Sequence, residues 1–249
     1  MNTMAKIAII GGTGLTKLTD LKITGREVHV SGYGEPSAPL TRGILAGKEV
    51  VFLPRHGAAH TIPPHKVNYR ANIAVLKNAG VENIIAINAV GGITAEMAPQ
   101  SIVIPDQIID YTWSRQHTFF EEGLTEVVHV DFTSPYCEQL RQLILKAAAK
   151  AKVAVVAKAT YGATQGPRLE STAEVDRIER DGCHIVGMTG MPEAGLAREM
   201  ELCYACIAVV VNKAAGRGEG EITMQEIEHN LGAGIDQVKR ILESVISLL

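Results

Sequence analysis

An arginine and two histidines lie within six residues of one another, directly after an apolar run, and could bind an anion. The run at residues 49–53 leads into Pro54-Arg55-His56-Gly57, and His60 follows three residues later. A guanidinium group can bind a phosphate through two parallel hydrogen bonds, and glycine lets the backbone come close to a ligand. We therefore expect an oxyanion pocket here. The alternative, on these residues alone, is a solvated basic loop.

Three further apolar runs end in small or hydroxyl-bearing residues. The segments are Gly11-Gly12-Thr13-Gly14-Leu15, Asn88-Ala89-Val90-Gly91-Gly92 and Gly187-Met188-Thr189-Gly190-Met191-Pro192-Glu193. Backbone N–H groups in such turns, and the hydroxyls of Thr13 and Thr189, can approach an anion. In the first segment Lys17 stands where a dinucleotide-binding fingerprint has its third glycine, so a nicotinamide cofactor is possible but disfavoured.

A helix is expected to begin immediately behind Thr189. Pro192 and Glu193 suit the first turn, because proline has no N–H to lose there and a carboxylate complements the positive helix end. A helix start also favours anion binding at Thr189. The simpler interpretation is that Thr189 only caps the helix.

Two polar side chains in the second half of the chain could recognise a ligand. Asn212 follows the all-apolar run 207–211, which predicts a strand buried on both faces, and ligands of open α/β sheets lie at the carboxyl ends of strands. Glu170 follows a Gly166-Pro167 turn. The simpler interpretations are that Asn212 begins a turn and that Glu170 is a helix-start carboxylate.

Apolar periodicity predicts one α/β domain over residues 1–249, with a mixed β-sheet flanked by helices. Strands are expected at 6–10, 27–31, 42–45, 49–53, 84–87, 102–109, 154–159 and 207–211. Helices are expected at 68–79, at 140–151 and from residue 223 to the end. Residues 111–129 form a long aromatic-rich excursion, typical of a binding loop or a subunit contact.

Composition excludes several classes of protein. A formal charge of −3 gives no basic excess for nucleic acid, and no apolar run approaches the roughly 18 residues of a membrane span. The amino terminus leads directly into a strand, which favours a cytoplasmic protein. The four cysteines are expected to be reduced and buried, although Cys203 and Cys206 have the spacing of a redox or zinc motif.

Taken together, the four segments resemble the trimeric nucleoside phosphorylases, the family of purine nucleoside phosphorylase and methylthioadenosine phosphorylase. The shared motifs are Gly11 to Leu15, Pro54 to Gly57 with His60, Asn88 to Gly92, and Gly187 to Ala194, in the family's order and spacing. The resemblance implies a homotrimer with sites near the subunit interfaces. It also implies reversible phosphorolysis of a purine nucleoside, with inorganic phosphate as co-substrate and no metal or organic cofactor.

By this resemblance, each part of the substrate has its own residues. Phosphate would be bound by Thr13, Arg55, His56, Asn88, Ala89 and Thr189, and the base by Glu170 and Asn212. The ribose and its 5′ group would contact Met188, His60, His129 and Met224, with His129 coming from a neighbouring subunit. Asn212, Glu170 and His56 are the residues expected to carry catalysis.

The base and sugar residues resemble different branches of the family. Asn212-Lys213 stands where methylthioadenosine phosphorylases have Asp-x-Asp, and it resembles the enzymes for 6-oxopurines. The segment 118–137 resembles the methylthioadenosine branch. The expected reaction is therefore phosphorolysis of S-methyl-5′-thioinosine to hypoxanthine and 5-methylthioribose 1-phosphate. Alternatives are a methylthioadenosine phosphorylase, a general inosine/guanosine phosphorylase, or a binding module without catalysis.

Overall fold

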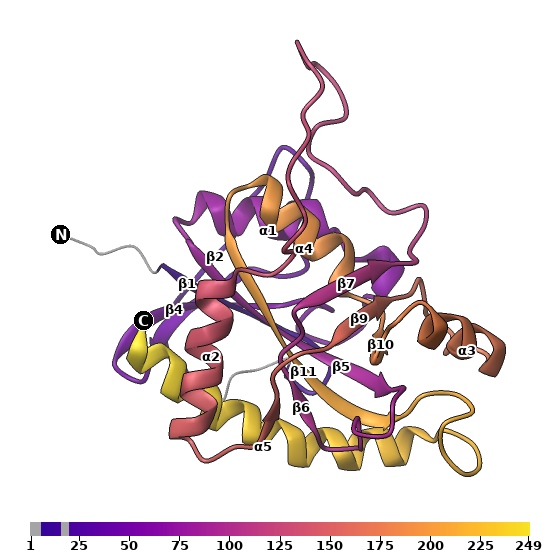
Figure 1. The fold of residues 1–249 in the computed structure, drawn as a ribbon. Helices are drawn as coiled ribbons and strands as arrows, with labels where there is room; N and C mark the ends of the chain where they lie inside the picture. Colours follow the sequence, from indigo (N-terminus) through magenta and orange to yellow (C-terminus); the bar gives the residue numbers. More distant parts are fainter. Residues whose placement is uncertain (1–5, 16–19) are drawn as a thin grey trace.

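One mixed β-sheet with helices around it organises the chain. The computed structural model describes residues 6–15 and 20–249, and within them eleven strands join into this sheet (Figure 1). The α/β prediction is thus confirmed; Lys17 lies outside the described residues. The strands are β1 (Ile7–Gly11), β2 (Lys22–Glu27), β3 (Leu40–Leu45), β4 (Lys48–Pro54), β5 (Asn83–Gly92), β6 (Ile102–Val103), β7 (Gln107–Asp110), β8 (Val155–Val156), β9 (Thr160–Ala163), β10 (Ile185–Gly187) and β11 (Cys203–Lys213).

Strand β5 is the branching point of the sheet. The main path runs β2-β3-β4-β1-β5-β10-β9-β7, while β11 pairs with the other edge of β5 and continues to β6 and β8. On the first edge, β1 pairs with residues 83–86 in parallel, and β10 pairs antiparallel with Gly91 and Gly92. The ends of β1, β10 and β11 are therefore gathered around the last residues of β5.

Two layers of helices cover the two faces of the sheet. Apolar residues of α1 (Tyr69–Asn78) and α4 (Gly190–Glu199) share a buried cluster with Ile10, Leu53 and Val210. Those of α2 (Glu138–Lys150) and α5 (Met224–Leu248) pack with the alternate strand residues Ile9, Phe52 and Val209. The short α3 (Thr172–Arg180) packs with Val186 and Cys183 in a third cluster, and a 3-10 turn, η1, spans Pro64–Lys66. Because successive strand residues point to opposite faces, the central strands are apolar throughout.

Capping side chains place three of these helices where the sequence predicts or allows them. Asn68 accepts a hydrogen bond from the Ala71 N–H at the start of α1, and Thr223 accepts one from Glu226 at the start of α5. At α3, Ser171 and Glu174 form a capping box. Helix α4 differs, because Thr189 is its N-cap residue but makes no side-chain capping bond.

Several predicted strand boundaries are wrong. The expected strand at 27–31 lies instead at Lys22–Glu27, paired with β3. The one at 154–159 shrinks to Val155–Val156, and Thr160–Ala163, where no strand was expected, forms β9 between β10 and β7. The run 102–109 divides into β6 and β7, and β5 continues through Asn88 and Ala89 instead of ending there. Pairing between distant segments decides where each of these strands begins and ends, and this pairing cannot be predicted from the local sequence pattern.

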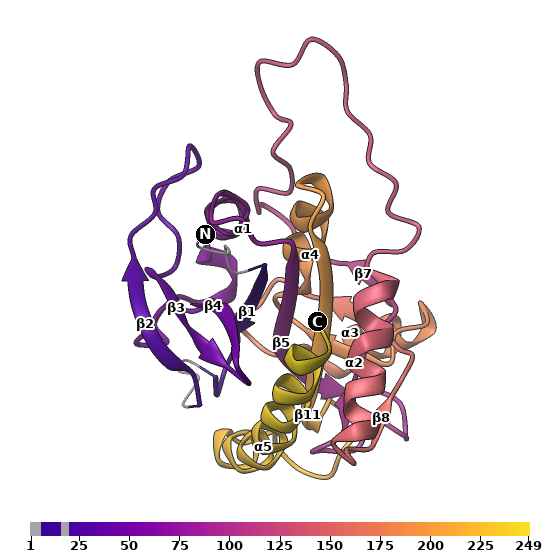
Figure 2. The same cartoon turned by 90° about the vertical axis from the view of Figure 1, so that its left-hand side faces the viewer.

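Residues 111–135 leave the body of the protein as a long excursion. They contain neither helix nor strand and rise away from the sheet in both views (Figure 2). The distal part, including Leu124, Val127 and Val130, is exposed. Among the described helices, none combines the length and apolarity that crossing a bilayer requires.

Candidate active site

A cavity of about 400 Å³ opens where β1, β4, β10 and β11 end beside β5. Ten of the twelve residues predicted for the site line it: Thr13, Arg55, His56, His60, Ala89, Glu170, Met188, Thr189, Asn212 and Met224. The volume is in the range of about 300–1,000 Å³ that is usual for small-molecule sites. Asn88 and His129 are not among the lining residues. The fold thus brings together residues that lie more than two hundred positions apart in the sequence, such as Thr13 and Met224.

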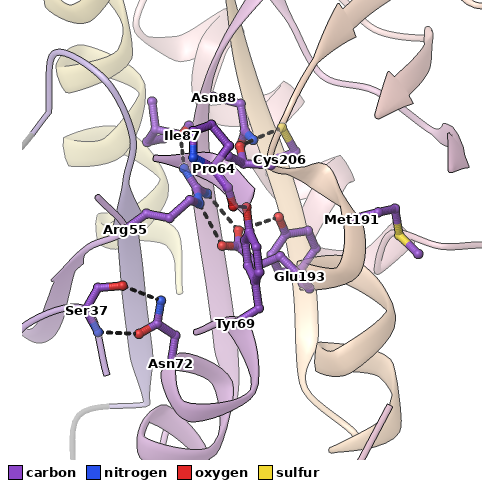
Figure 3. Close-up of polar contacts among 12 residues, drawn as sticks. Ser37, Arg55, Pro64, Tyr69, Asn72, Ile87, Asn88, Met191, Glu193 and Cys206 are labelled. Atoms are coloured by element: carbon purple, nitrogen blue, oxygen red, sulfur yellow. Dashed lines mark hydrogen bonds and ion pairs between the residues drawn. The ribbon is translucent and has the colours of Figure 1, made fainter. Parts of the chain in front are cut away.

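Arg55 is held at the bottom of this cavity by an ion pair with Glu193 (Figure 3). Its Nε and Nη2 donate to the two carboxylate oxygens, each at 2.7 Å, and Nη1 donates to the Ile87 carbonyl at 3.0 Å. Neither side chain has any exposed surface, and the Tyr204 hydroxyl donates to Glu193 at 2.8 Å. Burial opposes the charge on Arg55, but the Glu193 carboxylate outweighs it and raises the pKa of the guanidinium.

This pairing changes the expected roles of both residues. Glu193 faces Arg55, so its main contact is not with the positive end of α4 as the sequence predicts. The Nε–Nη2 edge of Arg55 is occupied, so a phosphate cannot use it for the bidentate contact expected from sequence. A guanidinium has five N–H groups, and the contacts above use three of them. The other two, on Nη1 and Nη2, are the donors left for an anion; Arg55 borders the cavity but has no exposed surface in this structure, so an anion reaches them only if the side chains around Arg55 move.

Thr189 is oriented from behind by a buried amide. The Asn88 Nδ2 donates to Thr189 Oγ1 at 2.7 Å. The Cys206 thiol donates to Asn88 Oδ1 at 3.3 Å (Figure 3). Burial raises the pKa of that thiol, so it stays protonated and able to donate. Since Thr189 Oγ1 accepts from Asn88 and caps no helix, its own proton is free to point into the cavity.

His56 is neutral near pH 7. Its Nδ1 lies 2.8 Å from the Ile62 carbonyl, which can only accept, so Nδ1 carries the proton and Nε2 is left as an acceptor. Burial, and then the positive charge of Arg55, lower the pKa of His56 to about 4. It can therefore accept a hydrogen bond from a protonated phosphate oxygen, but it supplies no positive charge.

His60 and Thr13 form a second pair at this end of the cavity. The His60 Nε2 lies 3.2 Å from Thr13 Oγ1, and its ring meets that of His56 edge to face, with the centroids 5.1 Å apart. His60 has a left-handed backbone with φ of 54°, which is uncommon for a residue other than glycine. It thus lies beside the predicted phosphate residues as well as the ribose position expected from sequence.

The opposite end of the cavity holds Glu170 and Asn212. The Thr164 hydroxyl donates to Glu170 at 2.6 Å, and Asn212 Nδ2 donates to the Lys213 carbonyl at 2.6 Å. A register shift in β11 between Val210 and Asn212 lets both Val211 and Asn212 line the cavity. In a regular strand, neighbouring side chains would point to opposite faces. The bulge is therefore what turns Asn212 toward a ligand.

The predicted sugar residues divide between this cavity and the excursion. Met188 and Met224 line the cavity, and Met224 is 64% exposed at the first position of α5. His129 lies exposed in the excursion, outside the cavity of its own chain. In this structure it is therefore not placed to contact a ligand in that cavity.

Sequence interpretation was wrong for two of the four cysteines. Cys137 and Cys203 form a disulfide, whereas Cys183 and Cys206 are free and buried as expected. Cys203 and Cys206 are three residues apart on β11, so they face opposite sides of the sheet and cannot act as one pair. Within residues 6–15 and 20–249, no three His, Cys, Asp or Glu side chains are grouped so that they could hold a metal ion.

The order and geometry of these segments match a known family. The model of the phosphorylase superfamily matches residues 6–247. The chain belongs to the phosphorylase superfamily. A superfamily member from Pseudomonas syringae pv. tomato, named probable S-methyl-5′-thioinosine phosphorylase, is 54% identical over 244 residues, which cover 98% of this chain and 99% of that protein.

More distant members of the superfamily carry other names. The 6-oxopurine nucleoside phosphorylase of Pyrococcus furiosus is 43% identical over 99% of this chain and 94% of its own length. Among solved structures, the methylthioadenosine phosphorylase from Schistosoma mansoni in complex with adenine has a TM-score of 0.94 and 32% identity, covering 98% of this chain and 91% of that one.

Two buried residues that contact the residues lining the cavity are not predicted from the sequence. Glu193 was assigned only to a helix end, and Arg115 was hidden in the aromatic-rich excursion. Arg115 is buried while Trp113 and Ser114 before it and Gln116 after it are exposed. A single cation in an aromatic segment is the only local signal, and it does not say which segments the cation joins.

Proposed function

We propose that the protein catalyses phosphorolysis of S-methyl-5′-thioinosine, giving hypoxanthine and 5-methylthioribose 1-phosphate. What carries the proposal is that Asn212 and Glu170 line the same cavity as Arg55 and Thr189. An asparagine amide can donate toward O6 or N7 of a 6-oxopurine, and a glutamate can accept from its N1–H. A carboxylate in place of Asn212 would face O6 with charge of the same sign.

In the proposed mechanism, phosphate is the nucleophile at the anomeric carbon of the sugar. Arg55, Thr189 and Thr13 donate hydrogen bonds to it, and His56 accepts one through Nε2. As the bond to the base breaks, positive charge builds on the sugar and negative charge on the purine. Asn212 stabilises that charge and the proton at N7, while Glu170 orients the base, so positioning and electrostatics supply most of the acceleration.

The sugar end is proposed to be completed by a second copy of the chain. Met188 and Met224 give the cavity a polarizable thioether surface that suits a methylthio group. His129, exposed on the excursion, would reach the site of a neighbouring subunit in a homotrimer. Light scattering should then report the mass of three chains, and a monomeric mass would contradict the assembly.

No cofactor is included in this proposal. Phosphate is a co-substrate, and phosphorolysis needs neither a redox group nor a metal when these side chains stabilise the charges. Full activity in the presence of a chelator is the expected outcome. The cytoplasmic location stays a prediction from sequence.

The decisive experiment measures release of free base from three nucleosides, each with and without phosphate. S-methyl-5′-thioinosine is expected to be preferred over methylthioadenosine by on the order of a hundredfold in kcat/KM, because mispaired buried polar groups cost about 1–3 kcal/mol each. Inosine, which lacks the methylthio group, should react more slowly. A preference for methylthioadenosine would refute the proposed base contacts. Base release that does not need phosphate, or no release at all, would refute phosphorolysis.

Two alternatives within the same chemistry are supported by specific observations. The solved neighbours include a methylthioadenosine phosphorylase, and the relatives include a 6-oxopurine nucleoside phosphorylase. The same three assays separate them, since the first would favour methylthioadenosine and the second would accept inosine as well as its methylthio analogue.

A further inference from the structure

Arg115 lies at the root of the excursion and does not line the cavity, but it contacts one segment that does and another that lies behind the cavity lining. It is buried, with 9% of its surface exposed, and follows β7 by five residues. The cavity-lining residues do not include it. Its effect on a ligand would therefore have to pass through the segments that it contacts.

The first of these segments is the sugar-side wall at 188–191. Arg115 Nη1 donates to the carbonyl of Met188 at 2.7 Å and to that of Met191 at 2.6 Å. Met188 lines the cavity, and Thr189 follows it directly. One nitrogen of Arg115 thus fixes the backbone on both sides of the threonine proposed to bind phosphate.

The second segment, 164–165, does not line the cavity itself but supports its base-side wall through Glu170. Nη2 donates to the carbonyls of Thr164 at 3.2 Å and Gln165 at 2.8 Å, and Nε donates to the Gln165 side-chain oxygen at 3.1 Å. Thr164 is also the residue whose hydroxyl holds Glu170. One guanidinium group therefore binds both the residue that hydrogen-bonds Glu170 and the backbone on either side of Thr189.

The partners of Arg115 are unusual for a buried cation. They are four backbone carbonyls, the Gln165 amide oxygen and the Tyr69 hydroxyl at 3.3 Å, and the guanidinium carbon lies 5.5 Å from the Tyr69 ring centre. In the described part of the chain, no carboxylate forms an ion pair with it. A buried charge stabilised by carbonyl dipoles depends on the exact positions of those carbonyls. The place of Arg115 in the structure is therefore explained by the positions of its oxygen partners and not by an ion pair.

We propose that Arg115 is a positioning residue that sets the separation between the sugar-side wall and the base-side wall. The inference rests on the proposed function, because a nucleoside must be held at both walls at once, whereas phosphate or a free purine uses only one. A misplacement of about 1 Å can cost on the order of a hundredfold in rate. A planar fork of five donors fixes this spacing, and the single ammonium of lysine cannot reproduce it.

The test compares one-sided binding with turnover in Arg115→Ala and Arg115→Lys. We expect kcat/KM for the preferred nucleoside to fall about a hundredfold in Arg115→Ala, while calorimetry gives dissociation constants for hypoxanthine alone and phosphate alone that stay close to wild type. Guanidinium ion, at concentrations that leave the protein folded, should restore part of the lost rate. Arg115→Lys should keep the fold and still lose most of the rate.

Arg141→Ala provides a matched control. Arg141 is also buried and donates to backbone carbonyls, those of Pro105 and Ala157 among them, but it lies outside the cavity lining. Its replacement should lower stability and leave kcat/KM of the folded enzyme unchanged. The inference is overturned if both Arg115 variants retain wild-type kcat/KM, if they lose no more than Arg141→Ala, or if one-sided binding falls in parallel with turnover. Failure of the proposed function is seen separately, as absence of phosphate-dependent base release by the wild-type protein.

Discussion

The two ends of the cavity differ in how deeply their side chains are buried. At the phosphate end, Arg55 and Glu193 have no exposed side-chain surface, and Asn88 and Thr189 are buried behind and beside them. At the base end, Leu169 is 45% exposed and Glu170 is half-buried, and of the two base residues only Asn212 is buried. The phosphate end is part of the protein core, whereas much of the base end is a rim.

Hydrogen bonding differs in the same direction. Arg55, Glu193 and Tyr204 share four hydrogen bonds with one another and with Ile87, whereas, among the described residues, the side chains of Glu170 and Asn212 form one each. A change at the phosphate end should therefore disturb folding and catalysis together. A change at the base end should alter the choice of substrate with little effect on stability. Three variants test this difference.

The largest effect is expected from Glu193→Gln. Removing the carboxylate leaves Arg55 as an unpaired buried charge, and breaking a buried pair costs about 3–5 kcal/mol. Urea unfolding should show that loss, and the KM for phosphate should rise because the guanidinium is no longer fixed.

The exposed pair between Arg168 and Glu174 is a matched control. Its two hydrogen bonds, both 2.7 Å, are also bidentate, through Nη1 and Nη2 of Arg168, but the side chains are 70% and 43% exposed. Solvent screens such a pair, so Glu174→Gln should change stability far less than Glu193→Gln. Equal losses in the two variants would contradict the assignment of the phosphate end to the core.

Asn212→Ala should give the second-largest effect, and on catalysis alone. Removing one preorganised donor lowers kcat by about 10²–10³. The free energy of unfolding should change little, because the side-chain bond of Asn212 is to the adjacent Lys213 carbonyl. Asn212→Asp should in addition shift the ratio of kcat/KM values toward methylthioadenosine. Near-normal turnover by Asn212→Ala would show that the residue does not have the proposed role. The control is Asn78→Ala, which removes an amide at the exposed end of α1.

The same division describes what could be predicted from sequence. Residues that line the cavity, such as Thr13, His56 and Asn212, stand at the ends of apolar runs, and the rule that ligands meet carboxyl ends of strands found them. The helix start at Thr223 and the buried strand β11 were likewise visible in local pattern. Other predicted residues that line the cavity, Met188 and Met224 among them, were expected from the family resemblance alone.

Residues that support the site could not be found in this way. Glu193 is 138 positions from Arg55, and Arg115 acts on segments 49 and 73 positions away. Strand β9 and the disulfide between Cys137 and Cys203 depend equally on distant pairing. A residue that contacts a ligand can be predicted from local sequence, because its side chain stands directly after the strand that positions it. The distant residue that holds such a side chain in place cannot be predicted from local sequence.

The smallest expected effect concerns His56 and the pH dependence of stability at the phosphate end. Burial and the charge of Arg55 lower the pKa of His56 from an ordinary value of 6.5 to about 4. Between these values the unfolded chain binds a proton at this residue and the folded chain does not, so protonation favours unfolding. The contribution of His56 is fully present above about pH 6.5 and is lost as the pH falls toward 4.

His56→Gln removes this titration, so the stability difference between wild type and variant should be larger at pH 7 than at pH 5. Urea denaturation at the two pH values measures that difference directly. Asn78→Ala, at the exposed end of α1, changes no titrating group and is the control, so it should give the same difference at both pH values. If the His56→Gln difference were also independent of pH, His56 would be as accessible to protons as a residue of the rim. The boundary between the buried phosphate end and the open base end would then have to be drawn closer to Arg55.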